Sequence, residues 1–124
     1  MEDTKQNEDG PHKAYFADGT LSEVGEYKDG MRHGHWKFYL RNGVVKATGE
    51  FIGGEHNGQW KWTRENRKPL QEGTFEAGVQ QGVWKRWYDN GQLYDEGEYV
   101  DGKKAGEWKI FYRDGKPKKS RTYK

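Results

Sequence analysis

Glycines and large aromatic residues recur along the chain with a constant spacing of 24 residues. One glycine column is Gly10, Gly34, Gly58, Gly82 and Gly106, followed two positions later by His12, Trp36, Trp60, Trp84 and Trp108. A second is Gly25, Gly49, Gly73 and Gly97, and the same offset leads to Tyr27, Phe51, Phe75, Tyr99 and Tyr123. Such a fixed period is typical of a repeat array. It predicts one repeat domain over 10–124, with units 10–33, 34–57, 58–81, 82–105 and a shorter 106–124.

Each unit carries the pattern of a β-hairpin. Short aromatic and β-branched runs flank Asp18-Gly19, Asn42-Gly43, Asn90-Gly91 and Asp114-Gly115, dipeptides typical of two-residue type I′ turns. The third unit has Asn66-Arg67 with Pro69, so we expect an irregular turn there. Hairpins joined by four or five residues leave no room for a crossover helix, which predicts an antiparallel meander of about ten strands.

Residue alternation around Asn42 and Gly43 predicts one apolar and one polar face. Trp36, Phe38, Leu40, Val45, Ala47 and Phe51 would share the apolar face. Trp36 would face Gly49, and likewise Trp60 Gly73, Trp84 Gly97 and His12 Gly25, so each ring is expected over the glycine of its own hairpin. Lys61 opposite Glu72 and Lys85 opposite Glu96 would lie on the polar face, where Trp87 and Tyr94 are also expected to pair.

The composition favours a folded β protein despite a poor supply of aliphatic residues. Leu, Ile, Val and Phe total only 17 of 124 residues, and the mean hydropathy is −1.36. The net charge is nevertheless only +2, and 19 aromatic residues with 18 glycines suit strands and tight turns. The predicted fold class is therefore all-β: an elongated, twisted single-sheet meander of about five stacked β-hairpins.

Several functional classes are disfavoured by the same data. No apolar run is long enough to span a membrane, and the first residues do not resemble a signal peptide. A cytoplasmic location is favoured, with export after signal removal as the alternative. There are no cysteines, and the near-neutral charge argues against nucleic acid. Residues 1–9, acidic and outside the period, are expected to form a disordered polar arm.

The unit best seen from Gly82 to Gly102 has the pattern Gly-x-Trp-Lys-x-x-Tyr-x-(Asn/Asp)-Gly-x-Leu-x-x-x-Gly-Glu-Tyr-x-x-Gly, which fixes four glycines and three aromatic residues, here Trp84, Tyr88 and Tyr99. It resembles the MORN repeat, and more closely the variant found in bacterial antitoxin-like proteins. The resemblance covers 10–124. It implies an elongated sheet of stacked hairpins and a role in protein scaffolding, membrane or phospholipid attachment, or toxin neutralisation.

The sequence offers little for catalysis, cofactors or metals. Ser22 and Ser120 are the only serines, and neither a nucleophile triad nor a phosphate-binding loop can be assembled. His33 and His35, joined by His56 or Glu55, could hold a metal, but solvated loop histidines are the better interpretation. We therefore predict a non-enzymatic protein with no cofactor and no metal.

Binding surfaces are the remaining candidates. The column Trp36, Trp60, Trp84 and Trp108, with Gly49, Gly73 and Gly97, is interpreted as structural. Phe38, Trp62, Trp87 and Tyr94 are not required by the repeat, so they are the candidates for protein binding. The alternative function is attachment to an anionic lipid surface through Lys116, Lys118, Lys119, Arg121 and Lys124, residues that also suit edge protection. A small-ligand groove and homo-oligomerisation are further alternatives.

Overall fold

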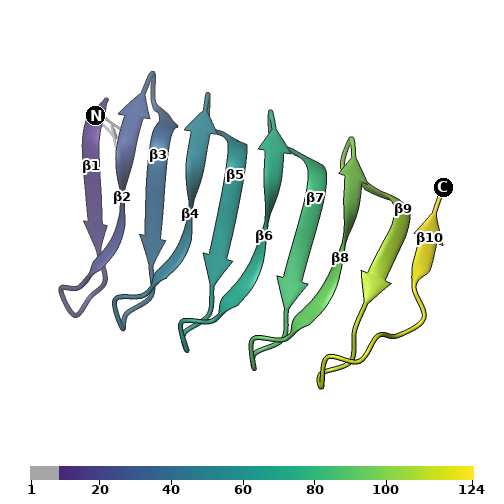
Figure 1. Ribbon diagram of the computed structural model, residues 1–124. Coiled ribbons are helices and arrows are strands. Elements are labelled where there is room, and N and C mark those ends of the chain that lie inside the picture. The colour runs from purple at the N-terminus through teal and green to yellow at the C-terminus, as the bar shows by residue number, and fades with distance from the viewer. Residues whose placement is uncertain (1–8) are drawn as a thin grey trace.

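A computed structural model describes residues 9–124, which form a single open antiparallel sheet with the strand order β1 to β10 (Figure 1). The strands are β1 (Gly10–Tyr15), β2 (Leu21–Lys28), β3 (Met31–Tyr39), β4 (Val45–Ile52), β5 (Glu55–Thr63), β6 (Pro69–Glu76), β7 (Val79–Trp87), β8 (Leu93–Val100), β9 (Lys103–Ile110) and β10 (Arg121–Tyr123). The predicted all-β meander is confirmed. The part of the chain that the structure describes contains no helix that could cross a membrane.

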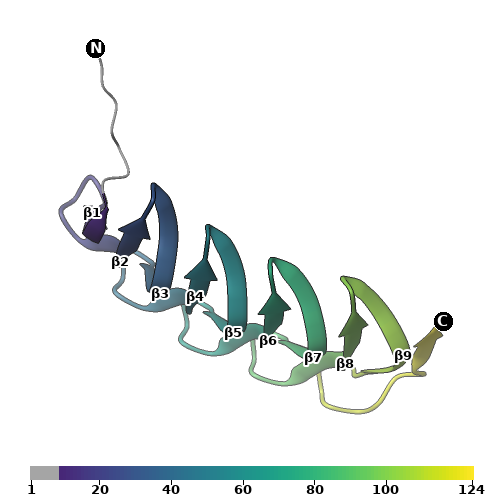
Figure 2. The same cartoon turned by 90° about the horizontal axis from the view of Figure 1, so that it is seen from above.

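The hairpins follow one another in a row, with the two ends of the sheet at opposite ends of an elongated molecule (Figures 1 and 2). From the second hairpin onward, each begins three residues before the glycine that opens the sequence unit, as Met31 precedes Gly34, whereas β1 begins at Gly10 itself. Of the predicted polar arm, residues 1–8 lie outside the described residues. Asp9 is described, and its Oδ1 accepts a hydrogen bond from Gly30 N at 3.1 Å.

The type I′ turns lie between successive hairpins, whereas the sequence predicted them within each hairpin. The Asn42-Gly43 loop is not type I′, because only Gly43 has a positive φ, of 87°. Gly43 N donates to Leu40 O at 2.9 Å and Leu40 N to Val44 O at 2.8 Å, which closes a three-residue loop with a left-handed last residue. Type I′ geometry occurs instead between hairpins, where Asp29 (φ 53°) and Gly30 (φ 77°) separate the paired residues Lys28 and Met31.

The third hairpin keeps the geometry of the others, so the expected irregularity is absent. Arg67 N donates to Arg64 O at 2.8 Å and Arg64 N to Lys68 O at 2.8 Å, which reproduces the loop at Asn42-Gly43. Arg67 adopts a φ of 72° where the other loops have glycine. This left-handed conformation costs a non-glycine residue about 1–2 kcal/mol, which the surrounding hydrogen bonds offset.

The core is a row of buried indoles on one face of the sheet, here called the inner face. Trp36, Trp60, Trp84 and Trp108 are 0–3% exposed. Trp36 pairs in register with Gly49 as predicted, but its ring lies over Gly25 of the preceding hairpin. A Cβ added to Gly25 would stand 2.0 Å from Trp36 Cδ2. The prediction that each indole covers its own hairpin's glycine is therefore wrong, and the indoles join successive hairpins instead.

This displacement has a visible cause in the register. The register between β2 and β3 shifts between Val24 and Glu26, so Gly25 is not paired with any residue of β3. A bulge leaves room for the indole to lean backwards, and its N–H then reaches the preceding strand. Trp36 Nε1 donates to Glu26 O at 3.1 Å, and Trp60 Nε1 to Glu50 O at 3.0 Å.

Side-chain amides link the hairpins at the loop end of the sheet. Asn42 Nδ2 donates to Glu65 O, Asn66 Nδ2 to Asp89 O and Asn90 Nδ2 to Arg113 O, at 2.8–3.1 Å. At the other end Gly54 N donates to Arg32 O at 3.1 Å, and Gly78 and Gly102 repeat this bond. The second to fifth hairpins are thus fastened to one another at both ends as well as through the core.

The face opposite the indoles, here called the outer face, is polar as predicted. Lys61 lies opposite Glu72 and Lys85 opposite Glu96, and the row continues with Glu96 opposite Lys109. The expected pair of Trp87 with Tyr94 is wrong, because Trp87 pairs with Leu93. The register shift at this point leaves Tyr94 unpaired in the ladder, and its ring stacks on Tyr88 with centroids 4.8 Å apart.

Candidate functional site

The inner face carries two hollows built on the same repeat positions. The first, here called the aromatic hollow, has a volume of about 340 Å³. It is lined by Arg32, Phe38, Lys46, Ala47, Phe51, Gly54, His56, Trp60 and Trp62. Phe38 lies between Trp36 and Trp60, with ring centroids 5.8 and 6.3 Å away, and Trp62 lies similarly between Trp60 and Trp84. The result is a continuous stack of half-buried and buried rings across β3, β5 and β7.

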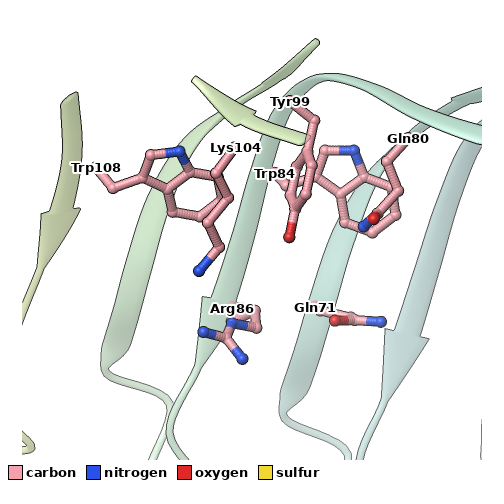
Figure 3. A pocket seen from close by; sticks show the side chains of 7 residues that line it. All are labelled: Gln71, Gln80, Trp84, Arg86, Tyr99, Lys104 and Trp108. Atoms are coloured by element: carbon pink, nitrogen blue, oxygen red, sulfur yellow. The ribbon is translucent and has the colours of Figure 1, made fainter. Parts of the chain in front are cut away.

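The second hollow, here called the polar hollow, has a volume of about 120 Å³ and is formed by β6 to β9. Its lining residues are Gln71, Gln80, Trp84, Arg86, Tyr99, Lys104 and Trp108 (Figure 3). The Lys104 ammonium and the Tyr99 hydroxyl point toward the side on which Arg86 and Gln71 lie (Figure 3). The two indoles lie on opposite sides of the hollow, with Arg86 and Tyr99 between them and the two glutamines beside Trp84 (Figure 3).

Arg86 and Asp95 form a two-bond ion pair beside the polar hollow. Arg86 Nε donates to Asp95 Oδ1 at 3.1 Å and the Nη2 group to Oδ2 at 2.7 Å. Asp95 is only 3% exposed, so its carboxylate depends on this guanidinium for compensation. The hydrogen bond to Asp95 holds the pKa of Arg86 above its ordinary value. Arg86 also lies over the Tyr94 ring, with Cζ 4.8 Å from its centroid.

Basic side chains line the aromatic hollow without filling it. Arg32 lies over Trp36 and Phe38, with Cζ 4.9 and 5.4 Å from the two centroids. Its Nη2 is 3.6 Å from Glu23 Oε1. The His56 ring is 4.5 Å from Trp60, and burial, followed by the charge of Arg32, lowers the pKa of His56 below its ordinary 6.5. His56 therefore contributes a neutral imidazole ring to the wall at neutral pH.

The four residues predicted as protein-binding candidates do not form one cluster. Phe38 and Trp62 line the aromatic hollow together. Trp87 alternates with Arg86 and so lies on the outer face, and Tyr94 is 37% exposed against Tyr88. The inner face thus brings together one pair of the four.

Sequence reasoning missed the polar hollow. Arg86 occupies a column that holds Phe38, Trp62 and Ile110 in other units, whereas Asp95 aligns with Ala47 but also with the polar Glu23 and Gln71. The sequence did contain one signal, because Arg86 breaks a column that is otherwise apolar. Only the structure shows that Lys104 and Gln71 reach the same space from other strands.

Of the basic C-terminal residues, Arg121 lies in the edge strand β10, and the four lysines lie in the segments beside it. Arg121 pairs with Trp108, and Pro117 bridges Phe111. Lys118 Nζ lies 5.0 Å from the Tyr112 centroid, and Arg121 Cζ lies 5.6 Å from that of Tyr123. Ser120 Oγ donates to Glu107 Oε2 at 2.9 Å. The chain ends as a short, charged edge strand.

The histidines lie in strands, so the expectation that they are solvated loop residues is wrong. His35 Nε2 is 2.9 Å from Thr48 Oγ1, whereas His56 packs among rings on the inner face. Across residues 9–124 there is no cluster of three or more His, Asp or Glu side chains suited to a metal ion.

Comparison with known families gives the class of protein. The family model of the MORN repeat variant matches residues 8–29, 32–52, 80–101 and 104–124. The chain therefore belongs to the MORN repeat variant family, whose repeats are generally non-catalytic modules that bind proteins or membranes. The unmatched stretch, 53–79, contains the β5–β6 hairpin, which nevertheless has the fold of its neighbours. No curated protein matches the chain significantly.

Proposed function

We propose that the protein is a non-enzymatic interaction module that binds a segment of another protein across its inner face. The observation that carries the proposal is the aromatic hollow, in which Phe38 and Trp62 extend a buried indole row to an open surface. Aromatic rings presented by a rigid scaffold are typical anchors for a partner's apolar side chain. The repeat framework supplies the rigidity, since the second to fifth hairpins are fastened to one another at both ends.

The experiment compares partner capture by the wild-type protein with capture by two altered forms. Partners recovered from the native host are identified by mass spectrometry, and their binding is repeated with purified components. Lys46→Glu changes the rim of the aromatic hollow, and Trp62→Leu its wall; Trp87→Ala on the outer face is the matched control. We expect both hollow variants to lose the partner and Trp87→Ala to retain it. Equal capture by all folded variants would refute the proposal.

Toxin neutralisation is a more specific form of this function, suggested by the resemblance to bacterial antitoxin-like proteins. It requires the bound segment to belong to a toxin. Co-expression then protects growth with the wild-type chain and not with Trp62→Leu. Growth arrest that persists with the wild-type chain excludes this role and leaves the binding function in place.

The second candidate is attachment to an anionic lipid surface through the basic C-terminal residues. Its support is that Lys116, Lys118, Lys119, Arg121 and Lys124 are concentrated on and beside the exposed edge strand β10. Each basic residue near such a surface contributes about 1 kcal/mol at low ionic strength. The wild-type protein should co-sediment with vesicles containing phosphatidylserine. The triple variant Lys118→Gln, Lys119→Gln, Arg121→Gln should remain in the supernatant. Lack of salt-sensitive sedimentation would exclude this candidate.

A further inference from the structure

The two hollows occupy equivalent positions in the repeat, two units apart. Arg32, Phe38, Phe51, His56 and Trp60 of the aromatic hollow stand 48 residues before Gln80, Arg86, Tyr99, Lys104 and Trp108 of the polar hollow. This offset is four strands, or about 19 Å at the usual interstrand spacing. An extended chain covers that distance with about six residues. A single bound segment crossing the strands can therefore reach both hollows.

The polar hollow favours an anion. Lys104 Nζ lies over the rings of Trp108 and Tyr123, 4.7 and 5.5 Å from their centroids. Within residues 9–124, no carboxylate comes within ion-pair distance of this ammonium. The buried carboxylate nearby, Asp95, is already neutralised by Arg86. The hollow therefore retains one uncompensated positive charge.

The other polar groups around the hollow are suited to the same ligand. The amide of Gln71 or Gln80 and the hydroxyl of Tyr99 can each donate a hydrogen bond. Bonds from such donors to an ionised acceptor are stronger than bonds to a neutral one. Arg86 retains N–H groups beyond the two bonded to Asp95. A carboxylate is small enough for 120 Å³ and can accept from several of these donors at once.

We propose that the polar hollow binds an Asp or Glu side chain of the partner segment, about six residues from the apolar side chain held in the aromatic hollow. This inference rests on the proposed function and specifies the partner's chemistry. A protein carboxylate suits the site better than a lipid surface, because the polar hollow lies between two indoles. The aromatic hollow is also within reach of the same extended segment, about six residues away. The partner is an extended segment with one apolar and one acidic anchor.

The test uses two synthetic peptides that differ in one group. The acidic probe is acetyl-Leu-Ser-Gly-Ser-Gly-Ser-Glu-amide, and in the neutral probe Gln replaces Glu. Affinities are measured by NMR titration of the labelled full chain. We expect the neutral probe to bind about tenfold more weakly, the usual size for loss of a charge-assisted hydrogen bond. This difference should shrink as salt is raised.

Two substitutions locate the effect. Lys104→Gln should bind both probes with similar affinity, and its folding is protected because Gln80 already occupies the same column. Lys109→Gln removes a lysine from the same strand on the outer face and should preserve the tenfold difference.

The outcomes separate this inference from the proposed function. If both probes bind equally and shift Phe38 and Trp62, the carboxylate site is refuted while the interaction function stands. If neither probe shifts Phe38 or Trp62, the proposed function fails with it. Phosphatidylserine vesicles form the second arm: binding that depends on Lys104, together with equal peptide affinities, would assign the cation to lipid and overturn the inference.

Discussion

The aromatic and polar hollows share a framework and differ in chemistry. Both stand on a buried indole, Trp60 in one and Trp108 in the other, beside an aromatic ring from the neighbouring strand. They differ where Phe38 and Ala47 are replaced by Arg86 and Asp95, and His56 by Lys104. Framework columns thus determine the fold, while columns between them are free to set what each hollow binds.

The changed positions are linked in pairs by the register of the sheet. Phe38 lies opposite Ala47, and Arg86 lies opposite Asp95. A buried carboxylate without its guanidinium would be strongly unfavourable, so these two polar residues are physically dependent on each other. An apolar pair has no such constraint.

The largest loss of stability should come from removing one partner of the Arg86–Asp95 pair, and the loss should depend on which partner is removed. Asp95 has a side-chain exposure of 5%, against 45% for Arg86. Arg86→Ala leaves a buried charge and should lower the free energy of unfolding by about 3 kcal/mol. Asp95→Ala leaves a guanidinium that reaches solvent, so we expect a loss of only about 1 kcal/mol. Urea denaturation measures both.

The double variant Arg86→Trp, Asp95→Ala copies Trp62 and Ala47 into the polar hollow. It should recover most of the stability lost in Arg86→Ala, because neither a charge nor an unsatisfied partner remains. A double variant as unstable as Arg86→Ala would show that the two hollows do not share one framework.

A smaller loss should follow from filling the space beneath Trp84, an indole that lines the polar hollow. A Cβ at Gly73 would lie 2.0 Å from Trp84 Cδ2, so Gly73→Ala forces the ring to move. Such overpacking typically costs about 1–3 kcal/mol. The control is Thr74→Ala, an exposed neighbour in the same strand. Similar melting temperatures for both variants would contradict the observed contact.

A gain in stability is expected in the β5–β6 hairpin, which contributes Trp62 to the aromatic hollow and Gln71 to the polar hollow. Arg67→Gly relieves a left-handed residue, and Gly43 and Gly91 already occupy the equivalent loop position. The gain should be about 0.5–1 kcal/mol, because the flexibility of glycine in the unfolded chain offsets part of the relief. Glu65→Gly in the same loop, where φ is not positive, serves as the control and should not stabilise the protein.

The smallest expected effect is a pH dependence of stability that arises at His56 in the aromatic hollow. Because the pKa of His56 is lowered in the folded protein, the unfolded chain binds the proton more readily. The contribution of neutral His56 to stability is therefore fully present above pH 6.5, and it is lost as the pH falls below this pKa of the unfolded chain. His56→Gln should show a smaller fall in melting temperature between pH 7.5 and 5.5. His35→Gln on the outer face is the control, and an equal response of both variants would contradict this role.

The sequence alone determines the 24-residue period, the all-β class, and the cross-strand pairing of Trp36 with Gly49 and of Lys85 with Glu96. These follow because strand alternation and turn residues act over a few neighbouring positions. It also indicates Phe38 and Trp62 as departures from the repeat, although it does not separate them from Trp87.

The tertiary structure decides which glycine each indole covers, which dipeptides form type I′ turns, and which side chains share a hollow. The indole of Trp36 lies on Gly25 because a register shift between hairpins opens that space. Gln71, Arg86 and Lys104 meet only because three strands bring them to one face. Local pattern carries no information on such contacts, since they depend on how successive hairpins pack rather than on the residues within one hairpin.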